Sequence, residues 1–174
     1  IADFVKEKLY EDQGLHCEVA KLKMDFMTRA QSLIHGDLHT GSIFINEEST
    51  KVFDPEFCFY GPMGYDIGNV IANMIFAWAN GDAAGAADFC KWVEDVLVDV
   101  INMTKEKMEK YYDEHVTDTM CRNELYKKYY MDTIIEDTSA VAGLELIRRI
   151  VGMANVKDIT TIADEAKRAR AEKI

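Results

Sequence analysis

Four side chains that can bind protons or divalent cations lie within a short part of the sequence: His35, Asp37, Asp54 and Glu56. Each stands at the edge of a short β-type run, where side chains from separate segments can converge on one cleft. Gly36 lets the backbone turn tightly beside Asp37, so the Asp37 carboxylate is a candidate for orienting or accepting the proton of an attacking hydroxyl group. Phosphoryl transfer to an alcohol requires this chemistry.

Asp54 and Glu56 are candidates for binding a magnesium ion. Side chains alternate along an extended chain, so we expect both carboxylates to project to one side, with their Cα atoms about 6–7 Å apart. Pro55 stiffens the link between them, and two hard oxygen ligands then face one cation. Acidic residues beside glycine and proline are also common in surface turns, so a structural role stays open for each residue taken alone.

His35 and His39 have the i, i+4 spacing of histidines that bind zinc from a helix. Gly36 between them and the β-type flanks oppose a helix, so the sequence does not favour zinc. We expect His35 to brace the loop by hydrogen bonding, and His39 either to do the same or to approach a phosphate group.

The composition favours one domain over residues 1–174, because a chain of this length with 48% hydrophobic residues can bury a core. The net charge of -11 repels nucleic acid and anionic lipid, so we expect no nucleic-acid partner and no membrane partner. No apolar run reaches about 18 residues and no signal sequence opens the chain, which favours a cytoplasmic protein.

The four cysteines, Cys17, Cys58, Cys90 and Cys121, lie too far apart for a C-x-x-C pair. This spacing argues against a zinc knuckle and against a disulfide framework. We expect free thiols that mostly pack in the core.

Three short segments rich in β-branched and aromatic residues are predicted to be strands: Ser32–Ile34, Ser42–Ile45 and Lys51–Phe53. The last two are joined by the polar segment 46–50, which predicts a small β-hairpin. The candidate residues therefore lie on strand ends and loops.

The rest of the chain has the spacing of helices. A strong amphipathic helix is predicted from Ile67 to Trp78, with Asp66 near its start, where a carboxylate suits free backbone N–H groups. A second helix is expected over 89–101, and Gly14 is expected to separate two earlier helical pieces. The polar end of the chain, 163–174, is expected to be solvated. The fold class predicted is mainly α with a small β-hairpin.

The strings HGDLHTGSI (35–43) and DPEFCFYGPMGYDIG (54–68) resemble the catalytic and metal-binding loops of the aminoglycoside phosphotransferase and choline kinase group. Within that group they are most similar to the 5-methylthioribose kinase family, over roughly residues 30–80 and again at 143–152. The resemblance implies the protein-kinase fold, ATP as co-substrate, Mg²⁺, a homodimeric parent enzyme, and phosphorylation of the 1-hydroxyl of 5-methylthioribose in methionine salvage.

The resemblance also implies a role for each matching residue. Asp37 is the catalytic aspartate and contacts the acceptor, within a catalytic loop at 33–46. Asp54 and Glu56 replace the usual Asp-Phe-Gly metal aspartate and its neighbour, within a metal loop at 51–66. Asp66 hydrogen-bonds to the catalytic loop and braces it.

Arg148 and Arg149 match a paired-arginine feature that reaches the sugar site in methylthioribose kinases. The helix that carries them is apolar almost all round, so charges on it need partners. The simpler interpretation is that Glu145 pairs with both arginines at helical i+3 and i+4 spacing. From the residues alone the two interpretations are equal.

Two features depart from the wider group. Ser42 stands where protein kinases have a metal-binding asparagine, although methylthioribose kinases are similar to this chain there, and Glu56 is the candidate for the missing oxygen ligand. In addition, no Gly-rich phosphate loop and no strand lysine precede the first helix. We therefore expect a C-terminal lobe without the N-terminal lobe, a fragment with little or no activity by itself because the phosphate-orienting lobe is missing.

Three alternatives remain at this point. A kinase for another small alcohol, such as an aminoglycoside, choline or homoserine, would share the loops but would not prefer methylthioribose. A metal-dependent phosphohydrolase would release phosphate from monoesters without an acceptor sugar. A noncatalytic interaction module would bind neither magnesium nor sugar.

Overall fold

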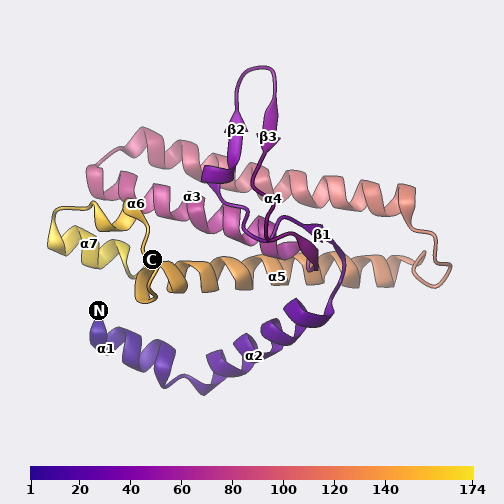
Figure 1. Cartoon of the computed structure of the whole chain (residues 1–174), viewed down its shortest axis with the longest axis horizontal. Helices are drawn as coiled ribbons and strands as arrows, with labels where there is room; N and C mark the ends of the chain where they lie inside the picture. Colours follow the sequence, from indigo (N-terminus) through magenta and orange to yellow (C-terminus); the bar gives the residue numbers. More distant parts are fainter.

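The computed structural model describes all residues, 1–174. Three long helices lie side by side and form its centre (Figure 1): α3 (Gly64–Ala84), α4 (Ala87–His115) and α5 (Glu124–Val151). The predicted helices over 67–78 and 89–101 are therefore confirmed, and each extends beyond its predicted ends. None of the helices combines the length and the apolar character that crossing a membrane requires.

The N-terminal segment consists of α1 (Ala2–Val5), a π-helical stretch at Lys6–Tyr10, and α2 (Gln13–Thr28). The chain breaks before α2 at Asp12, whose side chain accepts a hydrogen bond of 2.9 Å from the Leu15 N–H and so caps the helix. Gly14 lies inside the first turn of α2, so the expectation that it separates the helical pieces is wrong. No residue of α2 is buried.

The strands form two antiparallel pairs. β2 (Ile43–Ile45) and β3 (Thr50–Val52) make the predicted hairpin, which projects away from the helices in Figure 1. β1 (Ser32–Ile34) pairs with β4 (Phe59–Gly61), a strand that the sequence analysis missed. β4 ends directly before Pro62, and the Gly-Pro pair there has the pattern of a chain breaker.

The contact between α3 and α5 fixes the start of α3. A Cβ atom on Gly64 would lie 2.6 Å from the Thr138 nitrogen, and one on Gly68 would lie 2.6 Å from the Thr138 carbonyl oxygen. Both distances are shorter than atomic contacts allow, so the helices can approach this closely only because these positions are glycine. Asp66 lies between the two glycines, and its position is therefore set by helix packing.

The end of the chain packs partly on the core: most residues of the tail expected to be solvated, 163–174, are exposed, but Ala171 is buried. α6 (Lys157–Thr160) and α7 (Glu165–Ala171) bring Ile159 and Ala171 into a cluster with Phe76 of α3. Arg170 forms a 3.1 Å ion pair with Asp82, also on α3. The polar side chains face outward while small and aliphatic ones fill the core, a pattern too short in this segment to stand out in the sequence.

All four cysteines are free thiols, as predicted. The prediction that they mostly pack in the core is wrong: Cys90 is buried and Cys121 is half-buried, whereas Cys17 and Cys58 are exposed. Cys17 lies on α2, which has no buried residue, and Cys58 lies directly before β4.

Candidate active site

The backbone of the predicted catalytic loop is held by the side chain of Asp66. Its carboxylate accepts a 2.6 Å hydrogen bond from the His35 N–H and a 3.1 Å hydrogen bond from the Gly36 N–H. Gly36 has φ +84°, and a Cβ atom there would lie 2.2 Å from the Phe57 carbonyl oxygen. The turn therefore requires glycine, and it presses the catalytic loop against the metal loop.

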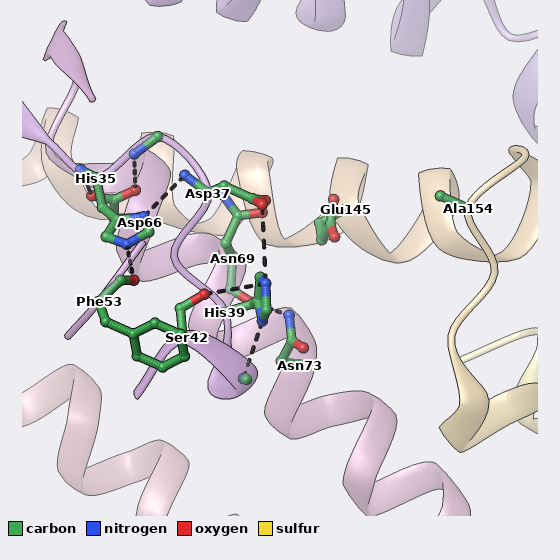
Figure 2. A network of polar contacts seen from close by, with 12 residues as sticks. His35, Asp37, His39, Ser42, Phe53, Asp66, Asn69, Asn73, Glu145 and Ala154 are labelled. Atoms are coloured by element: carbon green, nitrogen blue, oxygen red, sulfur yellow. Dashed lines mark hydrogen bonds and ion pairs between the residues drawn. The ribbon is translucent and has the colours of Figure 1, made fainter. Parts of the chain in front are cut away.

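His35 links the two loops a second time (Figure 2). Its Nδ1 accepts a 3.3 Å hydrogen bond from the Asp37 N–H, so its Nε2 carries the proton and donates to the Phe53 carbonyl oxygen at 2.9 Å. The Phe53 N–H in turn donates to the Ser42 carbonyl oxygen at 3.1 Å. Both backbone polar groups of Phe53 are thus hydrogen-bonded, and this fixes the position of the next residue, Asp54.

Asp54 is the only non-glycine residue with a positive φ, at 68°. The left-handed conformation is costly for a residue with a Cβ atom, by about 1–3 kcal/mol, and such residues concentrate at functional sites. A turn follows, closed by a 3.0 Å hydrogen bond from the Cys58 N–H to the Pro55 carbonyl oxygen. The expectation of an extended segment with Asp54 and Glu56 projecting to one side is therefore wrong, because the chain turns at both residues.

The residues present fit an open magnesium site and not a closed one. No three His, Cys, Asp or Glu side chains lie close enough together to hold a metal ion, so Asp37, Asp54 and Glu56 do not form a protein cage. Magnesium in phosphoryl-transfer sites is held by one or two carboxylates, with water and phosphate oxygens completing its shell. The exposed carboxylates of Asp54 and Glu56 match that kind of donor set.

The Asp37 carboxylate is accessible to a ligand. Its side chain is 46% exposed and accepts no hydrogen bond from within the chain, and its one ion-pair partner is the His39 ring, with Oδ2 4.0 Å from Nε2. In Figure 2 the carboxylate and the ring face each other above the start of α3. A carboxylate held by its backbone, with its oxygens free, is suited to orienting a hydroxyl group.

Glu145 on α5 holds both predicted substrate arginines. Its carboxylate accepts hydrogen bonds of 2.7 and 3.0 Å from Arg148 and one of 2.6 Å from Arg149. Burial alone would raise the pKa of Glu145, but the hydrogen bonds and charges of the two arginines outweigh it and lower that pKa. The pairing interpretation from the sequence is therefore confirmed. Of the two arginines, Arg148 is the one that a ligand can reach, because its side chain is 53% exposed.

A pocket of about 280 Å³ lies where α2, α3 and α5 meet. Its apolar wall consists of Val19, Leu22 and Phe26 from α2 together with Pro62, Val141 and Leu144, and its polar lining residues are Lys23, Tyr65, Asn69, Glu145 and Arg148. Burial raises the pKa of the Tyr65 phenol, and the Asp37 charge also acts on it in the same direction. The Asp37 charge likewise contributes to the raised pKa of Arg148, for which the hydrogen bond to Glu145 is the main cause.

The braced loop, the hairpin and the start of α3 all fall within a family match. The model of the family described as "Phosphotransferase enzyme family" matches residues 5–97, more than half of the chain. The chain belongs to the phosphotransferase enzyme family. The matched region contains Asp37, Asp54, Glu56 and Asp66, and the arginine pair lies outside it.

Curated relatives of this phosphotransferase match almost its whole length. It is 40% identical to "Methylthioribose kinase 1" of Oryza sativa subsp. japonica over 94% of the chain. It is 36% identical to "Methylthioribose kinase" of Bacillus pumilus over 96% of the chain, and 38% identical to the protein of the same name from Exiguobacterium sibiricum over 93%. The chain spans only 41–42% of the length of these relatives.

The sequence analysis did not single out two residues that line this pocket. Tyr65 and Asn69 line the pocket beside Arg148. Asn69 belongs to the helix predicted over 67–78, whereas Tyr65 lies before its predicted start and is part of α3 only in the structure. The pocket depends on how α2 lies against α5, which no local pattern in the sequence indicates.

Proposed function

We propose that this protein is an ATP-dependent kinase that phosphorylates the 1-hydroxyl of 5-methylthioribose, a step of methionine salvage. The observation that carries the proposal is the similarity to proteins named methylthioribose kinase, which continues over 93–96% of the chain and includes both loops and both arginines. The braced loop with its accessible aspartate supports the reaction class.

Asp37 is the residue we assign to the acceptor hydroxyl. Its carboxylate accepts the hydroxyl hydrogen and directs the oxygen toward the γ-phosphate. Asp66 and His35 hold the backbone at and directly before Asp37 through three hydrogen bonds, and a fourth joins the His35 ring to the Phe53 carbonyl oxygen. Such preorganisation matters because a misplacement of about 1 Å can cost on the order of 10²-fold in rate.

Asp54 and Glu56 are the residues we assign to Mg²⁺. The bound cation neutralises charge on the transferring phosphate. The strained backbone of Asp54 supports this assignment, because strain of this kind persists where the surroundings impose a functional geometry.

The pocket between α2, α3 and α5 is the acceptor site we favour. Its apolar wall suits a thioether substituent, and the Tyr65, Asn69 and Arg148 side suits sugar hydroxyl groups. Arg148 then contacts the sugar, while the more buried Arg149 keeps Glu145 in place.

The mainly helical fold with one projecting hairpin also supports the predicted assignment to the C-terminal lobe of a kinase-like fold. ATP would then be held jointly with the rest of the kinase fold, and residues 1–174 alone should turn over slowly or not at all.

A substrate panel tests the proposal. The full-length product of the gene is assayed with ATP and Mg²⁺ against methylthioribose, an aminoglycoside, choline and homoserine, and with a phosphate monoester alone. We expect kcat/KM for methylthioribose to exceed that for each other alcohol by at least about 10²-fold, and no monoester hydrolysis. Preference for another alcohol would overturn the assigned substrate, and hydrolysis without an acceptor would overturn the reaction class.

A further inference from the structure

The His39 ring stands between the catalytic aspartate and the anchor of the hairpin. It begins the short 3-10 turn at Thr40–Ser42 and folds back over it, so that Nδ1 accepts a 3.0 Å hydrogen bond from the Gly41 N–H. A Cβ atom on Gly41 would lie 2.9 Å from two atoms of the ring. The ring therefore rests directly on the turn, and its orientation is fixed.

This contact assigns the proton on the neutral ring. A nitrogen that accepts a hydrogen bond from a backbone N–H carries no hydrogen, so the hydrogen of His39 is on Nε2. Nε2 then donates to Ser42 Oγ at 3.2 Å, and Asp37 Oδ2 lies 4.0 Å from the same nitrogen (Figure 2).

The contact with Ser42 gives the His39 ring a role beyond capping the 3-10 turn. Its side chain is buried, and its carbonyl oxygen accepts the Phe53 N–H at the base of the hairpin, one residue before Asp54. His39 thus connects the anchor of the metal loop to the carboxylate of the catalytic loop. The 4.0 Å separation from Asp37 is beyond a hydrogen bond, but catalytic hydrogen bonds often tighten only when the substrate binds.

We propose that His39 is a positioning residue for phosphoryl transfer, whose single Nε2–H is shared between Ser42 Oγ and one oxygen of Asp37, so that the other Asp37 oxygen faces the acceptor hydroxyl. The inference rests on the proposed kinase function. The proposal gives each nitrogen of the His39 ring its own role. The hydrogen on Nε2 acts on Asp37, and Nδ1 only orients the ring.

Two substitutions separate the two ring nitrogens. In His39→Asn the amide oxygen takes the place of Nδ1 and keeps the Gly41 hydrogen bond, since asparagine is a favoured cap, but nothing replaces Nε2. In His39→Gln the longer amide places an N–H donor near the Nε2 position and gives up the cap. If His39 were only a cap, His39→Asn would be the mild change and His39→Gln the damaging one.

Steady-state kinetics of the full-length protein should show the opposite order. We expect His39→Asn to lower kcat by about 10–100-fold with KM for the acceptor within about twofold, and His39→Gln to retain kcat within about fivefold. His115→Asn, at an exposed histidine on α4, is the control and should match the wild type. Equal losses in the two His39 variants, or the reverse order, would overturn the proposal.

A double-mutant cycle with Asp37→Asn tests whether His39 acts through Asp37. When Asp37 is already changed, His39→Asn should cost no further activity, whereas a full additional loss means that the two residues act independently and refutes the inference. Asp37→Asn alone tests the proposed function, because an unchanged kcat would refute the catalytic role assigned to Asp37. Long-range ¹H–¹⁵N NMR of the histidine rings adds a readout without turnover, and a hydrogen on Nδ1 of His39 would itself refute the inference.

Discussion

Two buried carboxylates, Asp66 and Glu145, organise the two halves of the site in different ways. They lie on α3 and α5, the helices that pack together at Thr138, and are 9% and 6% exposed. The oxygens of Asp66 bind backbone N–H groups of the catalytic loop, and the oxygens of Glu145 bind two guanidinium groups. The Asp66 carboxylate thus fixes the backbone of the catalytic loop, whereas the Glu145 carboxylate holds two flexible arginine side chains.

This difference separates a rigid half of the site from an adjustable half. The N–H groups of His35 and Gly36 can leave Asp66 only if the loop refolds, so Asp37 stays where α3 places it. Arg148 can rotate toward a ligand while Arg149 continues to neutralise Glu145, because the two arginines bind the same carboxylate. The position of the Asp37 backbone is thus preset, and the contacts of the Arg148 guanidinium are exchangeable.

The largest expected effect follows from removing the rigid brace. Asp66→Ala leaves the two loop N–H groups without their charged partner, so we expect a loss of about 2–4 kcal/mol in the free energy of unfolding. We also expect kcat to fall on the order of 10²-fold as Asp37 loses its fixed position. Denaturant unfolding and steady-state kinetics measure the two losses. Asp99→Asn, at an exposed position within α4, is the control and should change neither. An Asp66→Ala variant with normal kcat would show that the brace is dispensable.

The close contact between α3 and α5 at Thr138 places Asp66 and Glu145 relative to each other, and two glycine substitutions test this contact. Gly68→Ala places a Cβ atom 2.6 Å from the Thr138 carbonyl oxygen, so the helices must separate, and we expect a loss of about 1–3 kcal/mol. Gly143 lies in α5, where an added Cβ atom would meet no other atom within 4 Å. Gly143→Ala should therefore stabilise the protein by about 0.5–1 kcal/mol. Denaturant midpoints of the two variants report the difference. Equal effects would mean that α3 and α5 are not closely packed at Thr138.

The stability that Glu145 gains from its two arginines should depend on pH. The pKa of Glu145 is lowered in the folded protein, so its contribution to stability is present above its ordinary pKa of 4.5 and is lost as the pH falls through the folded value. Glu145→Gln should therefore flatten the decline in the free energy of unfolding below about pH 4.5. At neutral pH we expect it to cost about 1 kcal/mol, because the half-exposed Arg148 can be solvated. Glu109→Gln, at an exposed position of α4, is the control. Identical acid slopes for wild type and Glu145→Gln would contradict the ion-pair account.

The elements of this site that depend on local pattern could be predicted from the sequence. The helix that begins near Asp66 follows from apolar spacing, the hairpin follows from two β-type runs joined by a polar segment, and the Gly36 turn follows from residue type. The resemblance to known kinases added the roles that we propose for Asp37, Asp54, Glu56 and Asp66.

The elements that depend on tertiary contact could not be predicted in the same way. β4 exists because three residues pair with β1, and a segment this short, whose last residue Gly61 already belongs to the Gly-Pro breaker, gives no strand pattern in the sequence. Asp54 adopts a left-handed conformation because Phe53 is held from both sides, and no alternation rule anticipates that. His39 has two candidate roles in the sequence, and only its distances to Gly41, Ser42 and Asp37 favour one of them.

The central claim is that Asp37 orients the acceptor hydroxyl while other residues bind the substrates, and kcat of Asp37→Asn in the full-length protein tests it most directly. We expect kcat for methylthioribose phosphorylation to fall by about 10²–10⁴-fold, with KM for the sugar within about twofold and an unchanged unfolding midpoint. An Asp37→Asn variant that retains wild-type kcat would contradict the account.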